Sequence, residues 1–154
     1  MSSHDKYAKY AERVRLFKGL KTCDVEEVLH SGKIIHFREG QTIFHEGMLG
    51  SNMFIVLGGK VGIYKKNRLI GHCAVGDAFG EMALLNGRPR SATASALGDV
   101  KLFTIDEREL KQVLRMPIGR QLLMNVVHVL SERLELANGR VSELSDTVDL
   151  VGAK

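Results

Sequence analysis

The chain has 154 residues, of which 44% are hydrophobic and 26% are charged, a balance typical of one globular domain. Its formal net charge of +4 comes from scattered lysines and arginines without a basic block, so a solvated surface explains it better than a nucleic-acid site. Cys23 and Cys73 lie too far apart for a zinc or disulfide motif, and the polar N-terminus and the lack of a long apolar run predict a cytoplasmic protein without membrane attachment.

Residues 1–32 carry helical patterns and are expected to form N-terminal helices. Apolar residues recur at helical spacing from residue 4 to residue 17. Asp24, followed three residues later by Glu27, is the capping-box pattern and predicts the start of a second short helix that ends near Ser31. We expect Cys23 in this segment, like Cys73, to be a buried thiol.

Residues 33–105 change to an apolar period of two, in short runs rich in Ile, Val and Phe. The runs read KIIHF, QTIFH, NMFIVL, KVGIY, RLIGHC, SATASA and KLFTI. Glycines separate them at intervals of roughly ten residues. The pattern predicts an antiparallel β-roll, similar to a jelly roll, so the fold class is mainly β with flanking helices.

Residues 106–154 return to helical spacing and are expected to form C-terminal helices and a tail. Asp106 with Glu109 predicts a capped short helix, and Pro117 fits the first turn of a long one. The long helix carries a heptad seam of apolar residues spaced four and three apart: Leu123, Val127, Leu130, Leu134, Ala137, Val141, Leu144, Val148 and Val151.

A second stripe lies on an adjacent face of this helix, formed by Leu122, Val126, Val129, Arg133 and Leu136. One stripe can pack on the β-roll while the other meets a second copy of the chain, which predicts a homodimer through residues 123–144. In the alternative, the heptad seam merely packs on the β-roll of its own chain. The second stripe could also fill that role, which makes this alternative the weaker one.

The stretch FGEMALLNGRPRSATASA, from Phe79 to Ala96, gathers residues that are poor core material. Gly80 and Glu81 open one predicted turn of helix, whose first backbone N–H groups lack partners and suit an anion. Arg90 returns after the turn NGRP and can offer two N–H donors to the same anion, and Ser91 can add a hydroxyl.

The carboxylate of Glu81 would repel an anion unless it points elsewhere and accepts hydrogen bonds from neutral hydroxyls. A phosphate beside a sugar hydroxyl, as in a ribose 3′,5′-cyclic monophosphate, suits both residues, although an ion pair of Glu81 with Arg90 and no ligand fits the spacing equally well.

Residues 79–93 resemble the phosphate-binding cassette of cyclic nucleotide-binding domains. The shared elements are Gly76-Asp77, Phe79-Gly80-Glu81, Ala83-Leu84 and Pro89-Arg90-Ser91-Ala92-Thr93. The resemblance extends through GQTIFHEGMLGSNMFIVLGGKVGIY and the flanking helices to about Leu144, so all three segments would form one such domain.

The resemblance implies a role for each site residue. Glu81 would accept from the ribose 2′-hydroxyl, and Arg90 would pair with the cyclic phosphate. The backbone of Gly80, Met82 and Ala83, with the Ser91 hydroxyl, would complete the anion site. Two positions of the long helix, Arg133 and Asn138, match residues that contact the base in some members. The ligand would be a cyclic nucleotide, with cyclic AMP slightly favoured over cyclic GMP.

The function expected from these features is that of a regulatory sensor that signals to an unidentified effector protein by movement of its C-terminal helices. No nucleophile elbow, phosphate loop or metal-ligand spacing of histidines is present, so neither an enzyme nor a metal site is expected. DNA binding is not expected either, because too few residues follow Leu144 for a helix-turn-helix. The main alternative is a dimeric adaptor of the same fold without a nucleotide. A third alternative is an enzyme of the cupin type, which elemental analysis would reveal through its bound metal.

Overall fold

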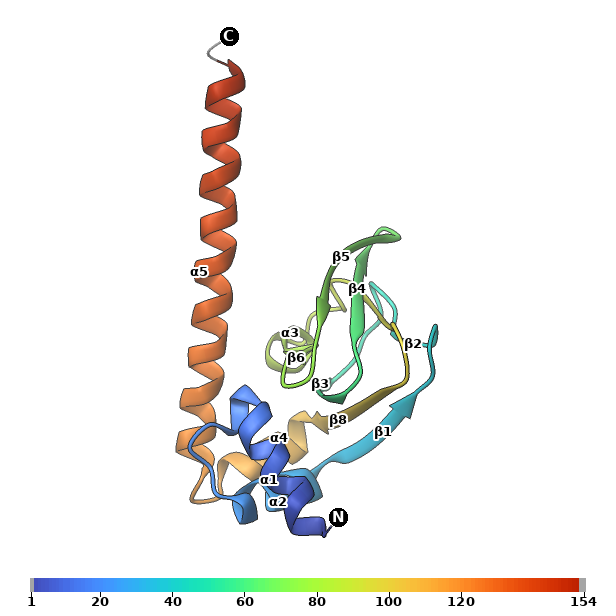
Figure 1. Ribbon diagram of the computed structural model, residues 1–154, viewed down its shortest axis with the longest axis vertical. Coiled ribbons are helices and arrows are strands. Elements are labelled where there is room, and N and C mark those ends of the chain that lie inside the picture. The colour runs from blue at the N-terminus through green and yellow to red at the C-terminus, as the bar shows by residue number, and fades with distance from the viewer. Residues whose placement is uncertain (1, 153–154) are drawn as a thin grey trace.

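Two four-stranded antiparallel sheets form the centre of the computed structural model, which describes residues 2–152 (Figure 1). The strands are β1 (Lys33–Phe37), β2 (Thr42–Phe44), β3 (Asn52–Gly58), β4 (Val61–Lys65), β5 (Arg68–Cys73), β6 (Ala78–Phe79), β7 (Thr93–Ala96) and β8 (Val100–Asp106). The helical segments are α1 (Ser3–Arg13), the 3-10 turn η1 (Arg15–Phe17), α2 (Thr22–Ser31), α3 (Glu81–Asn86), α4 (Glu107–Leu114) and α5 (Gly119–Gly152). The predicted fold class, a β-roll with N-terminal helices and a long C-terminal helix, is confirmed.

The strand order is β1-β8-β3-β6 in one sheet and β2-β7-β4-β5 in the other. Strand β3 is buried on both of its faces, because its side chains alternate between two separate cores. Met53 and Ile55 point toward the helices, whereas Phe54 and Val56 lie between the two sheets. This double burial explains why NMFIVL reads as an almost continuous apolar run.

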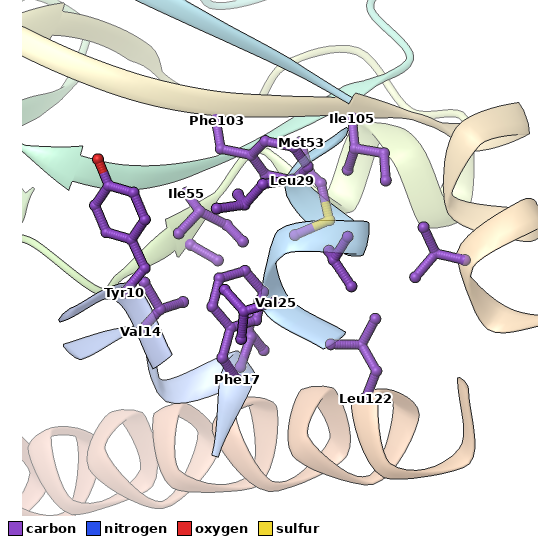
Figure 2. Close-up of a cluster of buried hydrophobic side chains, with 14 of the residues drawn as sticks. Tyr10, Val14, Phe17, Val25, Leu29, Met53, Ile55, Phe103, Ile105 and Leu122 are labelled. Carbon is purple, nitrogen blue, oxygen red and sulfur yellow. The ribbon is translucent and has the colours of Figure 1, made fainter. Parts of the chain in front are cut away.

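The first core joins the N-terminal helices, one face of the roll and the base of α5 (Figure 2). Phe17 and Val25 sit near its centre, with Phe103 above them and Leu122 of α5 below. Burying side chains of this size contributes about 1.5–3 kcal/mol each, so this cluster fixes the base of α5 to the rest of the chain.

Helix α5 stands beside the roll as one long rod, and its C-terminal half extends beyond the other helices (Figure 1). The stripe containing Leu122 and Val129 is buried against the first core. Further along α5 the heptad seam is exposed, and its members Leu134, Val141 and Leu144 are between 62% and 66% exposed. Near the base of the helix, Leu123 and Leu130 of the same seam border a small cavity between α5 and the roll. The two predicted stripes therefore differ near the base of α5, whereas both are exposed beyond it, where Leu136 of the second stripe is 66% exposed. None of the helices in the described residues is both long and apolar enough to cross a membrane.

The helix boundaries differ from the sequence expectation at four places. The helical spacing between residues 4 and 17 is interrupted at Val14, whose backbone is extended, so α1 ends at Arg13 and the separate turn η1 follows. Asp24 is not the cap of α2, because the helix begins at Thr22 and the Asp24 carboxylate accepts from the backbone N–H of Lys21 at 3.0 Å. Helix α5 begins at Gly119, so Pro117 belongs to the preceding turn and not to the helix. The start of α5 requires glycine, because a Cβ at position 119 would lie 2.0 Å from the carbonyl oxygen of Leu114. The expected tail is helical to Gly152.

The predicted helix cap at Asp106 is correct, whereas the predicted burial of the cysteine thiols is not. The Asp106 cap of α4 is confirmed, with reciprocal hydrogen bonds of 2.8 and 2.9 Å to Glu109. The expected burial of both thiols is wrong for Cys23, which is exposed on the first turn of α2, whereas Cys73 on β5 is half-buried.

Candidate functional site

The segment from β6 to β7 turns sharply at Gly80. This glycine adopts the left-handed conformation, with φ 77°, and precedes the first residue of α3. A Cβ at this position would lie 2.7 Å from Nη1 of Arg90, so both the conformation and the space require glycine. No side chain caps α3, and the backbone N–H groups of its first turn remain available to a ligand.

Arg90 is the most constrained charged residue of the site. Its Nη1 donates to the carbonyl of Gly80 at 2.9 Å, and its Nη2 donates to the carbonyl of Asn52 at 2.8 Å. The side chain is only 7% exposed. These two hydrogen bonds use two of the five N–H donors of the guanidinium and leave the others for a further acceptor.

No carboxylate forms an ion pair with Arg90 within residues 2–152. Removing the guanidinium from water disfavours its charged form, so burial lowers the pKa of Arg90 below its ordinary value. Buried charges in proteins are normally paired, and an isolated one is costly. The sequence was equally compatible with an ion pair between Arg90 and Glu81, but the structure does not contain this pair. The guanidinium of Arg90 is thus left without an ion-pair partner among residues 2–152.

Glu81 pairs instead with Arg133 of α5. Nη1 of Arg133 donates to Oε1 of Glu81 at 2.7 Å, and Nη2 donates to the carbonyl of Ala78. Because the carboxylate has a second oxygen, it can still accept a hydrogen bond from a neutral hydroxyl. Arg133 therefore connects the long helix to the segment that carries Arg90.

A cavity of about 410 Å³, which we call the Arg90 pocket, opens between this segment, strand β5 and helix α5. Its walls come from residues 77–83 and 90–92, from four side chains of the strands and from three of the helical segments: Phe44, Ile63, His72, Cys73, Arg15, Arg133 and Leu136. Three arginines and two acidic residues line the pocket, so it suits a ligand that carries both an anion and hydroxyl groups.

A second cavity of about 90 Å³ lies between the roll and α5 and is lined almost entirely by aliphatic and aromatic side chains. It shares only a few residues with the Arg90 pocket, among them Glu81 and Arg133. A charged nucleotide would lose its hydration there without gaining polar partners. The Arg90 pocket is the better candidate site.

Burial raises the pKa of the Cys73 thiol in this pocket to about 11, and the nearby carboxylate of Asp77 adds to the shift. The thiol is therefore protonated at neutral pH and behaves as a small apolar group. Among the described residues, no three side chains of His, Cys, Asp or Glu are grouped so that they could hold a metal ion.

Seven of the eight site residues proposed from the sequence line the Arg90 pocket: Gly80, Glu81, Met82, Ala83, Arg90, Ser91 and Arg133. Asn138 does not line the pocket of its own chain; it lies on the exposed part of α5. Arg133 lines the pocket while its guanidinium forms an ion pair with Glu81.

The groups that hold Arg90 were not predicted from the sequence. These are the carbonyl of Asn52, the ring of Phe44, and Gly50, where a Cβ would lie 2.7 Å from Nη2 of Arg90. The sequence signal for this set is the glycine at position 50, because a backbone carbonyl leaves no trace in residue identity.

Comparison with known protein families gives a match over the strands and the first C-terminal helix. The family model described as "Cyclic nucleotide-binding domain" matches residues 34–116. The chain is 31% identical over 115 residues to the cGMP-dependent protein kinase egl-4 of Caenorhabditis elegans, covering 73% of this chain and 15% of that protein. It is 30% identical over 117 residues to the cAMP-dependent protein kinase regulatory subunit of Mycosarcoma maydis, covering 70% of this chain and 22% of that protein. The chain thus spans less than a quarter of the length of these curated relatives.

Two solved structures share the fold. The catabolite activator protein of Thermus thermophilus superposes with a TM-score of 0.76 at 29% identity, covering 85% of this chain and 63% of that chain. A structure of PfPKA-R (141–441) with bound cAMP superposes with a TM-score of 0.66 at 29% identity, covering 87% of this chain and 47% of that chain.

Proposed function

The chain belongs to the cyclic nucleotide-binding domain family, and we propose that it binds a 3′,5′-cyclic nucleotide in the Arg90 pocket and signals occupancy through α5. The observation that carries the proposal is the buried, unpaired charge of Arg90. A cyclic phosphate has one negative charge and would supply the missing partner. Charge-assisted hydrogen bonds of this kind contribute about 1.5–3 kcal/mol each.

In this proposal Arg90 binds the cyclic phosphate together with the backbone N–H groups at the start of α3 and the hydroxyl of Ser91. Glu81 accepts a hydrogen bond from the ribose 2′-hydroxyl, the one sugar hydroxyl that a 3′,5′-cyclic nucleotide keeps free. The pairing of Glu81 with Arg133 supports this role, since it orients the carboxylate and leaves one oxygen unused. The chain would bind the nucleotide without converting it.

We propose cyclic AMP as the preferred ligand, with cyclic GMP as the competitor to be measured beside it. Both are represented among the relatives, which include a cGMP-dependent kinase and a cAMP-dependent kinase regulatory subunit. Arg133 and Asn138 are the side chains proposed to contact the base. Arg133 would do so while it keeps its ion pair with Glu81, since its two hydrogen bonds use only two of the five N–H donors of the guanidinium. Asn138 would need α5, or a second copy of it, to approach the pocket.

Signalling would use α5 because this helix both contacts the pocket and presents an unpartnered apolar seam. Arg133 links it to Glu81, and Leu136 lines the pocket one turn further along. A ligand that contacts Arg133 in only one position of α5 would favour that position. The exposed seam supports a homodimer through residues 123–144, whose partner helices would move together and change the surface offered to an effector protein.

Titration calorimetry of the full chain with cyclic AMP and with cyclic GMP tests the proposal. We expect one site per chain, with affinity in the micromolar range or tighter, and no measurable binding to an Arg90→Glu variant. Arg88→Glu is the matched control, since Arg88 lies in the same turn but is exposed, and it should bind like the wild type. Absence of binding to both nucleotides by the folded wild-type protein would refute the proposed function.

A further inference from the structure

Strand β2 carries an irregularity next to the Arg90 pocket. Thr42 pairs with Ser95 of β7 and Phe44 pairs with Ala94, so two steps along β2 match one step along β7. This is the geometry of a β-bulge, which re-aims side chains. Consecutive residues of a regular strand face opposite sides, yet Ile43 and Phe44 both pack against the core between the sheets.

The bulge brings the ring of Phe44 to the guanidinium of Arg90. The central carbon of the guanidinium lies 4.2 Å from the centroid of the Phe44 ring and 5.7 Å from that of Phe54. Phe44 in turn packs against Phe54 and Phe79, with centroid distances of 5.8 and 5.9 Å. Phe44 therefore contacts both Arg90 and the aromatic rings of the core, and Phe54 lies within reach of Phe44 and of Arg90.

We propose that Phe44 is a positioning residue that holds the Arg90 guanidinium in the orientation in which it receives the anion. The inference rests on the proposed function, because the anion is the cyclic phosphate. The hydrogen bonds to Gly80 and Asn52 fix one edge of the planar group but allow it to tilt about that edge. A flat ring with the central carbon of the guanidinium above it opposes the tilt, which an aliphatic side chain of similar volume does less well.

The ring also stabilises the positive charge before the ligand arrives. Its face is electron-rich, and a cation–π contact gains strength when water is excluded, as it is around the buried Arg90. An anion therefore meets a donor group that is already charged, ordered and partly desolvated, and binding loses less side-chain entropy.

The experiment compares three variants by calorimetric titration with cyclic AMP. Phe44→Leu removes the ring but keeps an apolar side chain, and we expect it to weaken binding about tenfold. Phe44→Tyr restores an aromatic face and should bind within about twofold of the wild type. Phe37→Leu is the matched control, since Phe37 packs on the same core without contacting Arg90, and it should also stay within about twofold.

Nuclear magnetic resonance of the nucleotide-free protein gives a readout that does not depend on affinity. Ring current from Phe44 should shift the Nε–H resonance of Arg90, and Phe44→Leu should move that resonance whereas Phe37→Leu should not. An unshifted resonance in the wild-type protein would overturn the inference even if a variant failed to fold.

The outcomes separate the inference from the proposed function. If the wild type binds cyclic AMP and Phe44→Leu binds equally well, or loses no more than Phe37→Leu, the positioning role is wrong and the proposed function stands. If the folded wild type binds neither cyclic AMP nor cyclic GMP, the proposed function fails and the positioning role fails with it.

Discussion

At the scale of single residues, the site is organised around Arg90, a cation that residues 2–152 enclose without forming an ion pair with it. Arg90 is held by two backbone carbonyls and by an aromatic ring, none of which carries a formal charge. Glu81, which lies in the same segment of the chain as Arg90, is directed to Arg133 instead. This division of charges keeps one donor group for an anion and one acceptor group for a hydroxyl within the same pocket.

Cys73 gives a prediction about pH. Its thiol should keep its proton in the folded protein up to about pH 11, whereas in the unfolded chain it ionises near its ordinary pKa of 9.0. This group therefore leaves the free energy of unfolding unchanged below pH 9 and lowers it as the pH rises from 9 to 11. Denaturant unfolding of the wild type and of Cys73→Ala across this range measures the effect.

The Cys73→Ala variant should lack this part of the pH dependence, and identical profiles for the two proteins would contradict the account. Thiol labelling provides a second readout at pH 8, where the raised pKa lowers the thiolate fraction of Cys73 about 100-fold. Exposed Cys23 should react first, and a bound nucleotide should further protect Cys73 while leaving Cys23 unaffected.

The site could be predicted from sequence only where a local motif encodes it. Gly80, Glu81 and Arg90 lie within one short segment, and the residue types of this segment predict its turns. The groups that hold Arg90 come from β2 and from the start of β3, more than thirty residues earlier in the chain. Pattern analysis of a single sequence cannot pair such distant residues, and it cannot locate a carbonyl ligand or a bulge.

At the scale of elements, the short turn η1 and helix α5 are joined by one buried amide. The side-chain nitrogen of Asn125 donates to the carbonyls of Leu16 and Lys18 at 2.8 Å each, and its oxygen accepts from Gln121 at 3.0 Å. All hydrogen-bonding groups of this amide are thus used within the fold. The N-terminal helices and the base of α5 should consequently move as one body.

Substitution of Asn125 tests this connection. Asn125→Ala leaves two carbonyls without donors, and we expect the free energy of unfolding to fall by about 2–4 kcal/mol. Asn138→Ala changes the same residue type on the exposed part of the same helix and should alter stability by less than about 0.5 kcal/mol. Chemical denaturation of both variants measures the difference. Equal stability of the two would mean that the Asn125 amide contributes nothing to the junction.

The elements themselves were largely predictable because their period and punctuation are strong. The seven apolar runs of the roll correspond to β1–β5, β7 and β8, while β6 has only two residues, too few for a period to emerge. The first turn of α2 was misassigned because Asp24 satisfies a capping pattern from inside the helix as well as from its start. The tail expected at the end of the chain is part of α5 instead, in agreement with the heptad seam, which continues through Val148 and Val151 at the same spacing.

At the scale of the whole molecule, α5 exposes an apolar seam along its C-terminal half. Its C-terminal half presents apolar side chains on the seam and has few contacts with the roll (Figure 1). Contiguous exposed apolar surface of this kind usually marks a site of association. Pairing of the seams of two copies would cover it while leaving both Arg90 pockets attached to the paired helices.

Leu144→Glu tests the pairing, because it places a charge at the centre of the exposed seam. Burying a leucine contributes about 1.5–3 kcal/mol, so loss of the pair should raise the dimer dissociation constant by about 100-fold or more. Ser142→Glu introduces the same charge at an outer position of the helix and should leave the dimer intact. Sedimentation equilibrium measures both. A monomeric wild type, or a Leu144→Glu protein that associates like the wild type, would exclude this interface.

The most direct measurement of the central claim is a crystal structure of the full chain grown with saturating cyclic AMP. The account predicts a nucleotide in the Arg90 pocket, with its cyclic phosphate accepting from the guanidinium of Arg90 and its ribose 2′-hydroxyl donating to Glu81. A pocket that stays empty at saturating nucleotide, or a nucleotide whose phosphate lies away from Arg90, would contradict it.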